Sequence, residues 1–88
     1  MKFSKTIENK RYGQVVMIRM QNHEGAPEIR FYCQPEGYGV CSFAIGWNED
    51  DKAEQKADEA FQNMKPQEMI EIVDGWLTHM TKQNAAMN

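Results

Sequence analysis

The sequence contains few cysteines and no long hydrophobic run, and both absences narrow what the protein can be. Its 88 residues include two cysteines, Cys33 and Cys41, which are too few for a disulfide framework or a four-cysteine zinc site. The longest apolar run covers residues 15–18, whereas a membrane-spanning helix needs about 20 such residues. Residues 1–12 show no apolar or arginine-rich leader. We therefore expect a cytoplasmic protein with reduced thiols and no membrane partner.

An excess of positive charge is also missing. Ten lysines and arginines face thirteen acidic residues, which gives a net charge of −3. Residues 1–47 hold six basic and four acidic residues, whereas residues 48–88 hold four and nine. Proteins that bind duplex DNA usually carry a basic excess, because neutralising phosphates dominates their affinity. Duplex DNA is therefore disfavoured as a partner, and the acidic half either attracts a basic partner or forms a solvated helical surface.

Residue combinations that carry catalysis or bind metals are missing as well. The two histidines, His23 and His79, have no companions at metal-ligand spacing. The acidic run at 49–51 lacks the alternating ligands and the glycine of a calcium loop. A Cys–His nucleophilic pair would need a thiol of lowered pKa, but the strand pairing described below buries both thiols. We expect no enzyme activity, no catalytic residue, no cofactor and no metal.

The residue composition of the chain changes near Asn48. Before it, β-branched and aromatic residues alternate with polar ones; after it, alanine, glutamate, lysine, glutamine and methionine dominate. The first pattern is typical of strands and the second of helices. We predict one α+β domain over residues 1–82, an antiparallel meander of three to four strands followed by two C-terminal helices packed on one sheet face. Residues 83–88 lack apolar anchors and are predicted to form a frayed tail.

The last hairpin of this sheet has a well-specified register. Residues 28–34 and 39–47 flank the turn-rich segment 35–38. Placing Cys33 opposite Cys41 also pairs Phe31 with Phe43 and makes one face wholly apolar. A slip by one residue would mix the two faces, so the pattern favours this register. The two thiols would then be close enough for a reversible disulfide, which we keep as an alternative to inert buried thiols.

For the preceding hairpin we predict a tight turn at Glu24-Gly25. This turn places Met20 opposite Ile29 and continues the apolar face through Ile18 and Val16. It also sets Arg19 opposite Arg30, a like-charge pair that costs stability. Residues 3–8 are predicted to add a further strand at the edge, although a lysine would share the face of its apolar residues.

Two helices are expected after the sheet. Asp50 or Asp51 is suited to cap the first helix, whose apolar stripe is rich in alanine. Pro66 is well placed to begin the second. The apolar residues of that second helix span an arc of about 160° at ~100° per residue. So wide an arc needs two neighbours, which are the sheet and either the first helix or another subunit.

The second face of the predicted sheet is the candidate partner-binding site. The registers above place Met17, Arg19, Arg30 and Tyr32 on it, together with small residues. Methionine, tyrosine and arginine are enriched at protein interfaces, whereas an ordinary solvated sheet face is polar. The alternatives are that another part of the chain covers this face, or that it is bare surface.

These features favour a small regulatory or inhibitory protein that binds a protein partner and is itself a homodimer. The alternative is binding of RNA or single-stranded nucleic acid, in which Tyr32 stacks on a base while Arg19 and Arg30 contact phosphates. A third hypothesis makes the acidic helices the contact surface for a basic partner, although helical i,i+4 pairing explains their charges equally well.

Overall fold

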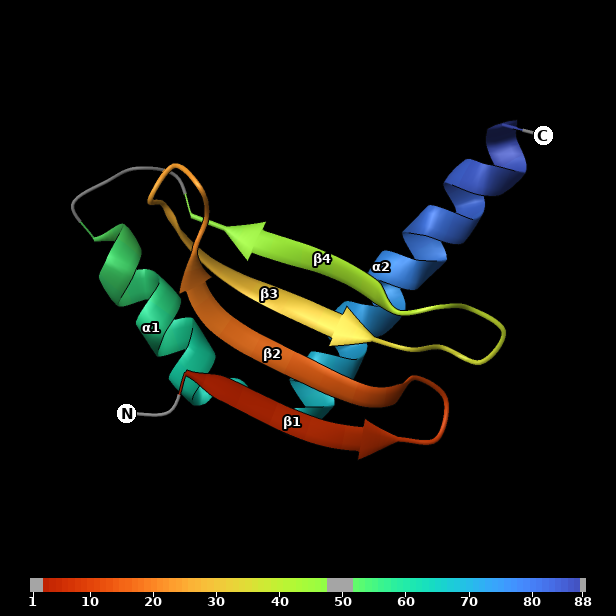
Figure 1. The fold of residues 1–88 in the computed structure, drawn as a ribbon, viewed down its shortest axis with the longest axis horizontal. Coiled ribbons are helices and arrows are strands. Elements are labelled where there is room, and N and C mark those ends of the chain that lie inside the picture. The colour runs from red at the N-terminus through yellow and green to blue at the C-terminus, as the bar shows by residue number, and fades with distance from the viewer. Residues whose placement is uncertain (1–2, 48–51, 88) are drawn as a thin grey trace.

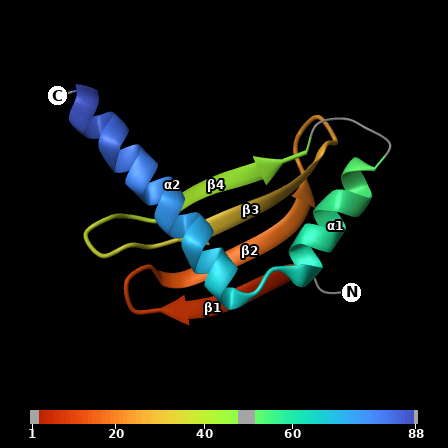
Figure 2. The same cartoon turned by 180° about the vertical axis from the view of Figure 1, so that it is seen from behind.

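The fold is a four-stranded antiparallel sheet with two helices on one face. A computed structural model describes residues 3–47 and 52–87 of the chain. The strands are β1 (Ser4–Asn9), β2 (Gly13–Gln21), β3 (Pro27–Cys33) and β4 (Cys41–Gly46), and the helices are α1 (Ala53–Asn63) and α2 (Pro66–Met87). The strands lie in the order β1-β2-β3-β4. Both helices cover the same face of this sheet (Figures 1 and 2). The predicted architecture is therefore confirmed.

The predicted edge strand exists as β1, which pairs with β2 from Ser4↔Ile18 to Asn9↔Gly13. Its lysine, Lys5, does lie on the covered side, and the structure explains why. The ammonium group of Lys5 donates hydrogen bonds to the carbonyl oxygens of Phe61, Gln62 (3.1 Å) and Met64 (3.4 Å). These carbonyls lie at the C-terminal end of α1, where a cation is favoured by the helix dipole. Lys5 therefore joins the sheet edge to the end of the helix.

The register of the last hairpin is as predicted, with Cys33↔Cys41, Phe31↔Phe43 and Ile29↔Ile45. The rings of Phe31 and Phe43 stack at 4.9 Å, and Phe43 stacks in turn on Trp76 of α2 at 4.6 Å. This column of three rings joins β3, β4 and α2.

The predicted register of the β2–β3 hairpin is wrong by one residue. Met17 lies opposite Phe31 and Arg19 opposite Ile29, so every side chain of β2 points to the face opposite the predicted one. The cause is the loop between the strands. The N–H of Asn22 donates to the carbonyl of Ala26 at 2.9 Å, which closes a loop of three residues instead of two.

The side chain of Asn22 stabilises this longer loop. Its oxygen accepts hydrogen bonds from the N–H groups of Glu24 (2.8 Å) and Ala26 (3.0 Å). Gly25 has φ +85, the left-handed conformation that a three-residue hairpin loop requires and that glycine adopts at low cost. The side chain of Asn22 thus stabilises a loop one residue longer than predicted, and this extra residue turns each side chain of β2 to the face opposite the predicted one.

The core lies between the sheet and the two helices. Its fully buried members include Val15, Met17, Ile29, Phe31, Met69 and Val73. The alanine stripe of α1 packs as predicted, with Ala53, Ala57 and Phe61 buried. The proposed caps, Asp50 and Asp51, lie outside the described residues.

The second helix begins at Pro66, as predicted, and continues to Met87. It therefore passes the predicted domain end at residue 82, and a separate tail over residues 83–88 stays a prediction. No helix in the described part of the chain is both long and apolar enough to cross a membrane.

Candidate functional site

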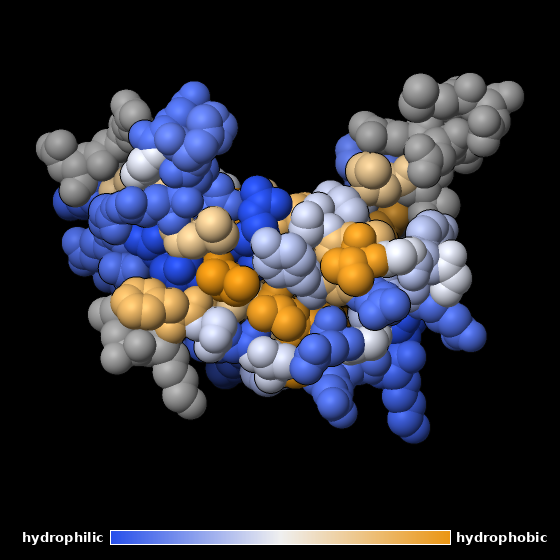
Figure 3. Space-filling model, viewed as in Figure 1, coloured by the Kyte–Doolittle hydropathy of each residue, from blue (hydrophilic) through white to orange (hydrophobic). Residues whose placement is uncertain are grey.

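The sheet has one face that neither helix covers, and Figure 1 looks directly onto it. In the middle of this face, Val16 and Ile18 of β2 lie beside Tyr32 and Arg30 of β3. Met20, the next residue of β2 on the same side, is 37% exposed. We call Val16, Ile18, Met20, Arg30 and Tyr32 the open-face patch. Hydrophobic side chains gather at the centre of this face, with polar side chains around them (Figure 3).

Met17 and Arg19 were predicted to belong to this face, and their placement there is wrong. Because of the shifted β2 register, Met17 is fully buried in the core. Arg19 also lies on the helix-covered side and is 9% exposed. Its guanidinium group contacts two carboxylates of α1, Asp58 at 2.9 Å and Glu54 at 2.7 Å. Neither residue is available to a partner.

Arg30 and Tyr32 do lie on the open face, and both are half-buried. The Nε atom of Arg30 lies 3.2 Å from a carboxylate oxygen of Glu28 on the same strand. This acid partly neutralises the arginine. The surface predicted for nucleic acid is therefore not assembled, because Arg19 lies on the other side of the sheet and Arg30 already has an acidic partner.

Sequence reasoning missed Val16, Ile18 and Met20 as surface residues. Alternate residues from Val15 to Met20 point to opposite faces, and apart from Arg19 both sets are apolar. The alternation of side chains therefore could not choose a face for β2. Asn22 was the available signal, since asparagine before a glycine-containing loop favours a turn that bonds to its own backbone.

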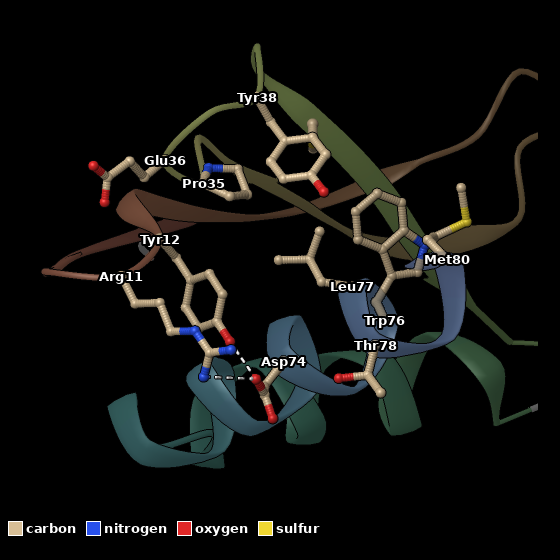
Figure 4. A pocket seen from close by; sticks show the side chains of 11 residues that line it. Arg11, Tyr12, Pro35, Glu36, Tyr38, Asp74, Trp76, Leu77, Thr78 and Met80 are labelled. Carbon is tan, nitrogen blue, oxygen red and sulfur yellow. Dashed lines mark hydrogen bonds and ion pairs between the residues drawn. The ribbon is translucent and has the colours of Figure 1, made fainter. Parts of the chain in front are cut away.

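A groove of about 770 Å³ opens on the other side of the molecule, where α2 leaves the sheet (Figure 4). It lies between α2 and the turns that join β1 to β2 and β3 to β4. Its lining residues are Arg11, Tyr12, Pro35, Glu36, Tyr38, Cys41, Asp74, Trp76, Leu77, Thr78 and Met80. The volume falls within the range of ligand pockets, and much of the lining is apolar.

One end of this groove is polar. The hydroxyl of Tyr12 donates a hydrogen bond to Asp74, and the guanidinium of Arg11 lies 3.5 Å from the same carboxylate. Burial and the hydrogen bond to Asp74 raise the pKa of Tyr12 above its ordinary value. The tyrosine stays a neutral donor, and its hydrogen bond links the first hairpin to α2.

The two cysteines are free thiols that face each other across β3 and β4. Cys33 is buried, and burial together with the neighbouring Cys41 raises the pKa of its thiol. Cys41 is half-buried beside the groove. Since the thiolate is the reactive form, the two should differ in reactivity.

We expect iodoacetamide to alkylate Cys41 about tenfold or more faster than Cys33 at mildly alkaline pH, because Cys33 is buried and its raised pKa leaves less of it as the reactive thiolate. Mass spectrometry of tryptic peptides over time measures the two rates. In urea the rates should converge, which provides the control. Equal rates in the folded protein would contradict the burial of Cys33.

Among residues 3–47 and 52–87, no group of three or more histidine, cysteine, aspartate or glutamate side chains is arranged to hold a metal ion. Comparisons of the chain with family models, curated proteins and solved structures found no match.

Proposed function

We propose that the chain is a non-enzymatic binding protein, a regulator or inhibitor that acts in the cytoplasm, forms a homodimer and contacts its protein partner through the open-face patch. The observation that carries this proposal is the row of Val16, Ile18 and Met20 on a sheet face that neither α1 nor α2 covers. A solvated face of an antiparallel sheet is normally polar. Val16 and Ile18 are half-buried and Met20 is exposed, and an apolar row that stays partly open to solvent on a small protein is typical of an interaction site.

The residues around this row also suit a protein partner. Tyr32 and Arg30 belong to the types enriched in interface centres, and no lysine lies beside them on β2, β3 or β4. Because Glu28 partly neutralises Arg30, the patch has little net charge. It therefore suits a partner surface of mixed apolar and polar character better than a polyanion.

Replacing Ile18 with lysine tests this function. Ile18 lies in the row Ser4, Ile18, Arg30, Ala44 and thus at the middle of the face. A charge there should lower capture of partner proteins by about tenfold or more, as hot-spot changes of ~2 kcal/mol do. Quantitative affinity purification from native lysate, with the wild type in parallel, measures this loss.

The matched control is Gln55→Lys, which adds the same charge on the exposed surface of α1. Its neighbour Glu59, four residues further on, can pair with the new lysine. This variant should capture partners as the wild type does. If Ile18→Lys folds, as judged by circular dichroism, and still recovers the same partners, the open-face patch is not the contact surface.

A further inference from the structure

One edge of the sheet lacks the features that normally protect an edge strand. In the described part of the chain β4 has a single strand neighbour, β3, and its sequence CSFAIG contains neither a charge nor a proline. Native edge strands usually carry charged residues, prolines or bulges that prevent pairing with another chain. The opposite edge, β1, follows this rule with Lys5 and Glu8. β4 is therefore an edge that can accept another strand.

The backbone groups that β4 offers can be identified. The N–H of Trp47 donates to the carbonyl of Pro27 at 3.3 Å, so residue 47 points its backbone groups at β3. Since this direction alternates along an antiparallel strand, the groups of Ser42, Ala44 and Gly46 point away from the sheet. Within the described chain no further strand pairs with them.

The strand is complementary to itself. In an antiparallel pair, residues directly opposite each other share a face. Centring the pair on Ala44 places Ser42 of one copy opposite Gly46 of the other and forms about six backbone hydrogen bonds. It also places Phe43 opposite Ile45 of the second copy, which extends the apolar helix-covered face. Both residues are only half-buried in the single chain.

The second helix extends beyond this edge. Its 22 residues span about 33 Å at 1.5 Å per residue, whereas four strands about 4.8 Å apart span only ~15 Å. Figures 1 and 2 show α2 crossing the sheet and continuing past β4. Where it passes β4, α2 lies on the helix-covered side of the sheet (Figures 1 and 2), so its overhang begins below the place that an added strand would occupy.

We propose that a second copy of this chain pairs its β4 with β4 about a two-fold axis normal to the sheet, so that one continuous eight-stranded sheet forms and each α2 passes beneath the sheet of the other copy. The axis keeps all four helices on one side. The groove beside α2 is lined in part by Trp76, Leu77 and Met80. In the dimer these apolar side chains would face the second copy. This inference specifies the homodimer of the proposed function and does not use the open-face patch.

A second copy of the chain accounts for both the free edge and the overhanging helix. After the two-fold rotation, β4 of each copy pairs with β4 of the other, and α2 of each copy lies beneath the sheet of the other. This reciprocity favours the homodimer over a strand from another protein. It also provides the second neighbour that the wide apolar arc of α2 requires.

The variant Ala44→Pro tests the pairing selectively. The N–H of Ala44 points out of the sheet, so proline removes a donor to the second copy but no bond to β3. We expect size-exclusion chromatography with light scattering to show a dimer for the wild type. Ala44→Pro should be a monomer with an unchanged circular dichroism spectrum. Ala44→Ser, which keeps the N–H, and Ile18→Lys should both remain dimers.

Three results would overturn the inference: a wild type that is monomeric from micromolar to millimolar concentration, an Ala44→Pro variant that stays dimeric, or a dimer that Ile18→Lys dissociates. A monomeric Ala44→Pro variant that still captures partners through an intact open-face patch separates this interface from the partner site.

If Ala44→Pro does not fold, amide hydrogen exchange of the wild type decides. The Ala44 amide should be protected at high concentration and lose that protection on dilution, and an unprotected amide at every concentration refutes the pairing.

Discussion

Replacing Phe31 with alanine is expected to lower the free energy of unfolding by about 3–5 kcal/mol, as for other fully buried phenylalanines. Phe31 has no exposed surface. It lies between Met17 and Phe43 in the middle of the sheet and begins the ring column that reaches α2. The alanine leaves a cavity that β3 cannot close without breaking two strand pairings. Urea denaturation followed by circular dichroism measures the loss.

Two further phenylalanines calibrate this result. Phe43 lies on the edge strand and is half-buried, so its alanine variant should lose about 2 kcal/mol. Phe3 is 58% exposed, and its replacement should change stability by less than about 0.5 kcal/mol. Because a domain of this size has only about 5–10 kcal/mol in total, Phe31→Leu provides a milder variant that stays folded. A loss for Phe31→Ala no larger than that for Phe43→Ala would contradict the central position of Phe31.

The sequence predicts β3, β4 and both helices well because each has one unambiguous apolar face. Between Ile29 and Cys33, large apolar side chains alternate with polar ones, so a single register buries them all. The alanine spacing of α1 and Pro66 at the start of α2 are equally local signals. Structure that depends on such local patterns follows directly from the residues.

The failure at β2 has a physical cause. From Val15 to Met20 both faces of the strand are apolar enough to be buried, so the register depends on the loop and not on the strand. Two hydrogen bonds to the side chain of Asn22 favour a loop one residue longer than the tight turn. Because of this one-residue difference, Val16 and Ile18 lie on the open face, where Met17 and Arg19 were predicted. Two of the four residues predicted for the open face, Met17 and Arg19, therefore lie on the other side of the sheet, whereas Arg30 and Tyr32 do lie on the open face.

An arginine on the core face could not be anticipated from the strand pattern. The partners that allow Arg19 to be buried, Glu54 and Asp58, come from a helix more than thirty residues further along the chain. Only the packing of α1 against β2 brings them together. Because side chains so far apart leave no periodic signal, the pattern alone suggested a solvent-facing charge.

The double variant Glu54→Gln/Asp58→Asn should therefore lower the free energy of unfolding by about 3 kcal/mol, since it leaves a buried guanidinium without an acid. The side chain of Arg19 is 7% exposed, whereas those of Glu54 and Asp58 are 58% and 43% exposed. The arginine thus depends on the carboxylates more than they depend on it. Replacing Arg19 with methionine fills the same space and leaves both acids in water, and should cost no more than about 1 kcal/mol.

Combining all three substitutions separates this explanation from a general loss of packing. If the penalty of the double variant comes from the unpaired buried charge, adding Arg19→Met should restore about 2 kcal/mol, a coupling that a thermodynamic cycle from urea denaturation resolves. Additive losses in the triple variant, or an Arg19→Met variant less stable than the double variant, would show that the arginine contributes mainly through its own contacts. In that case, the packing of α1 against β2 would not depend on the ion pairs that Arg19 makes with Glu54 and Asp58.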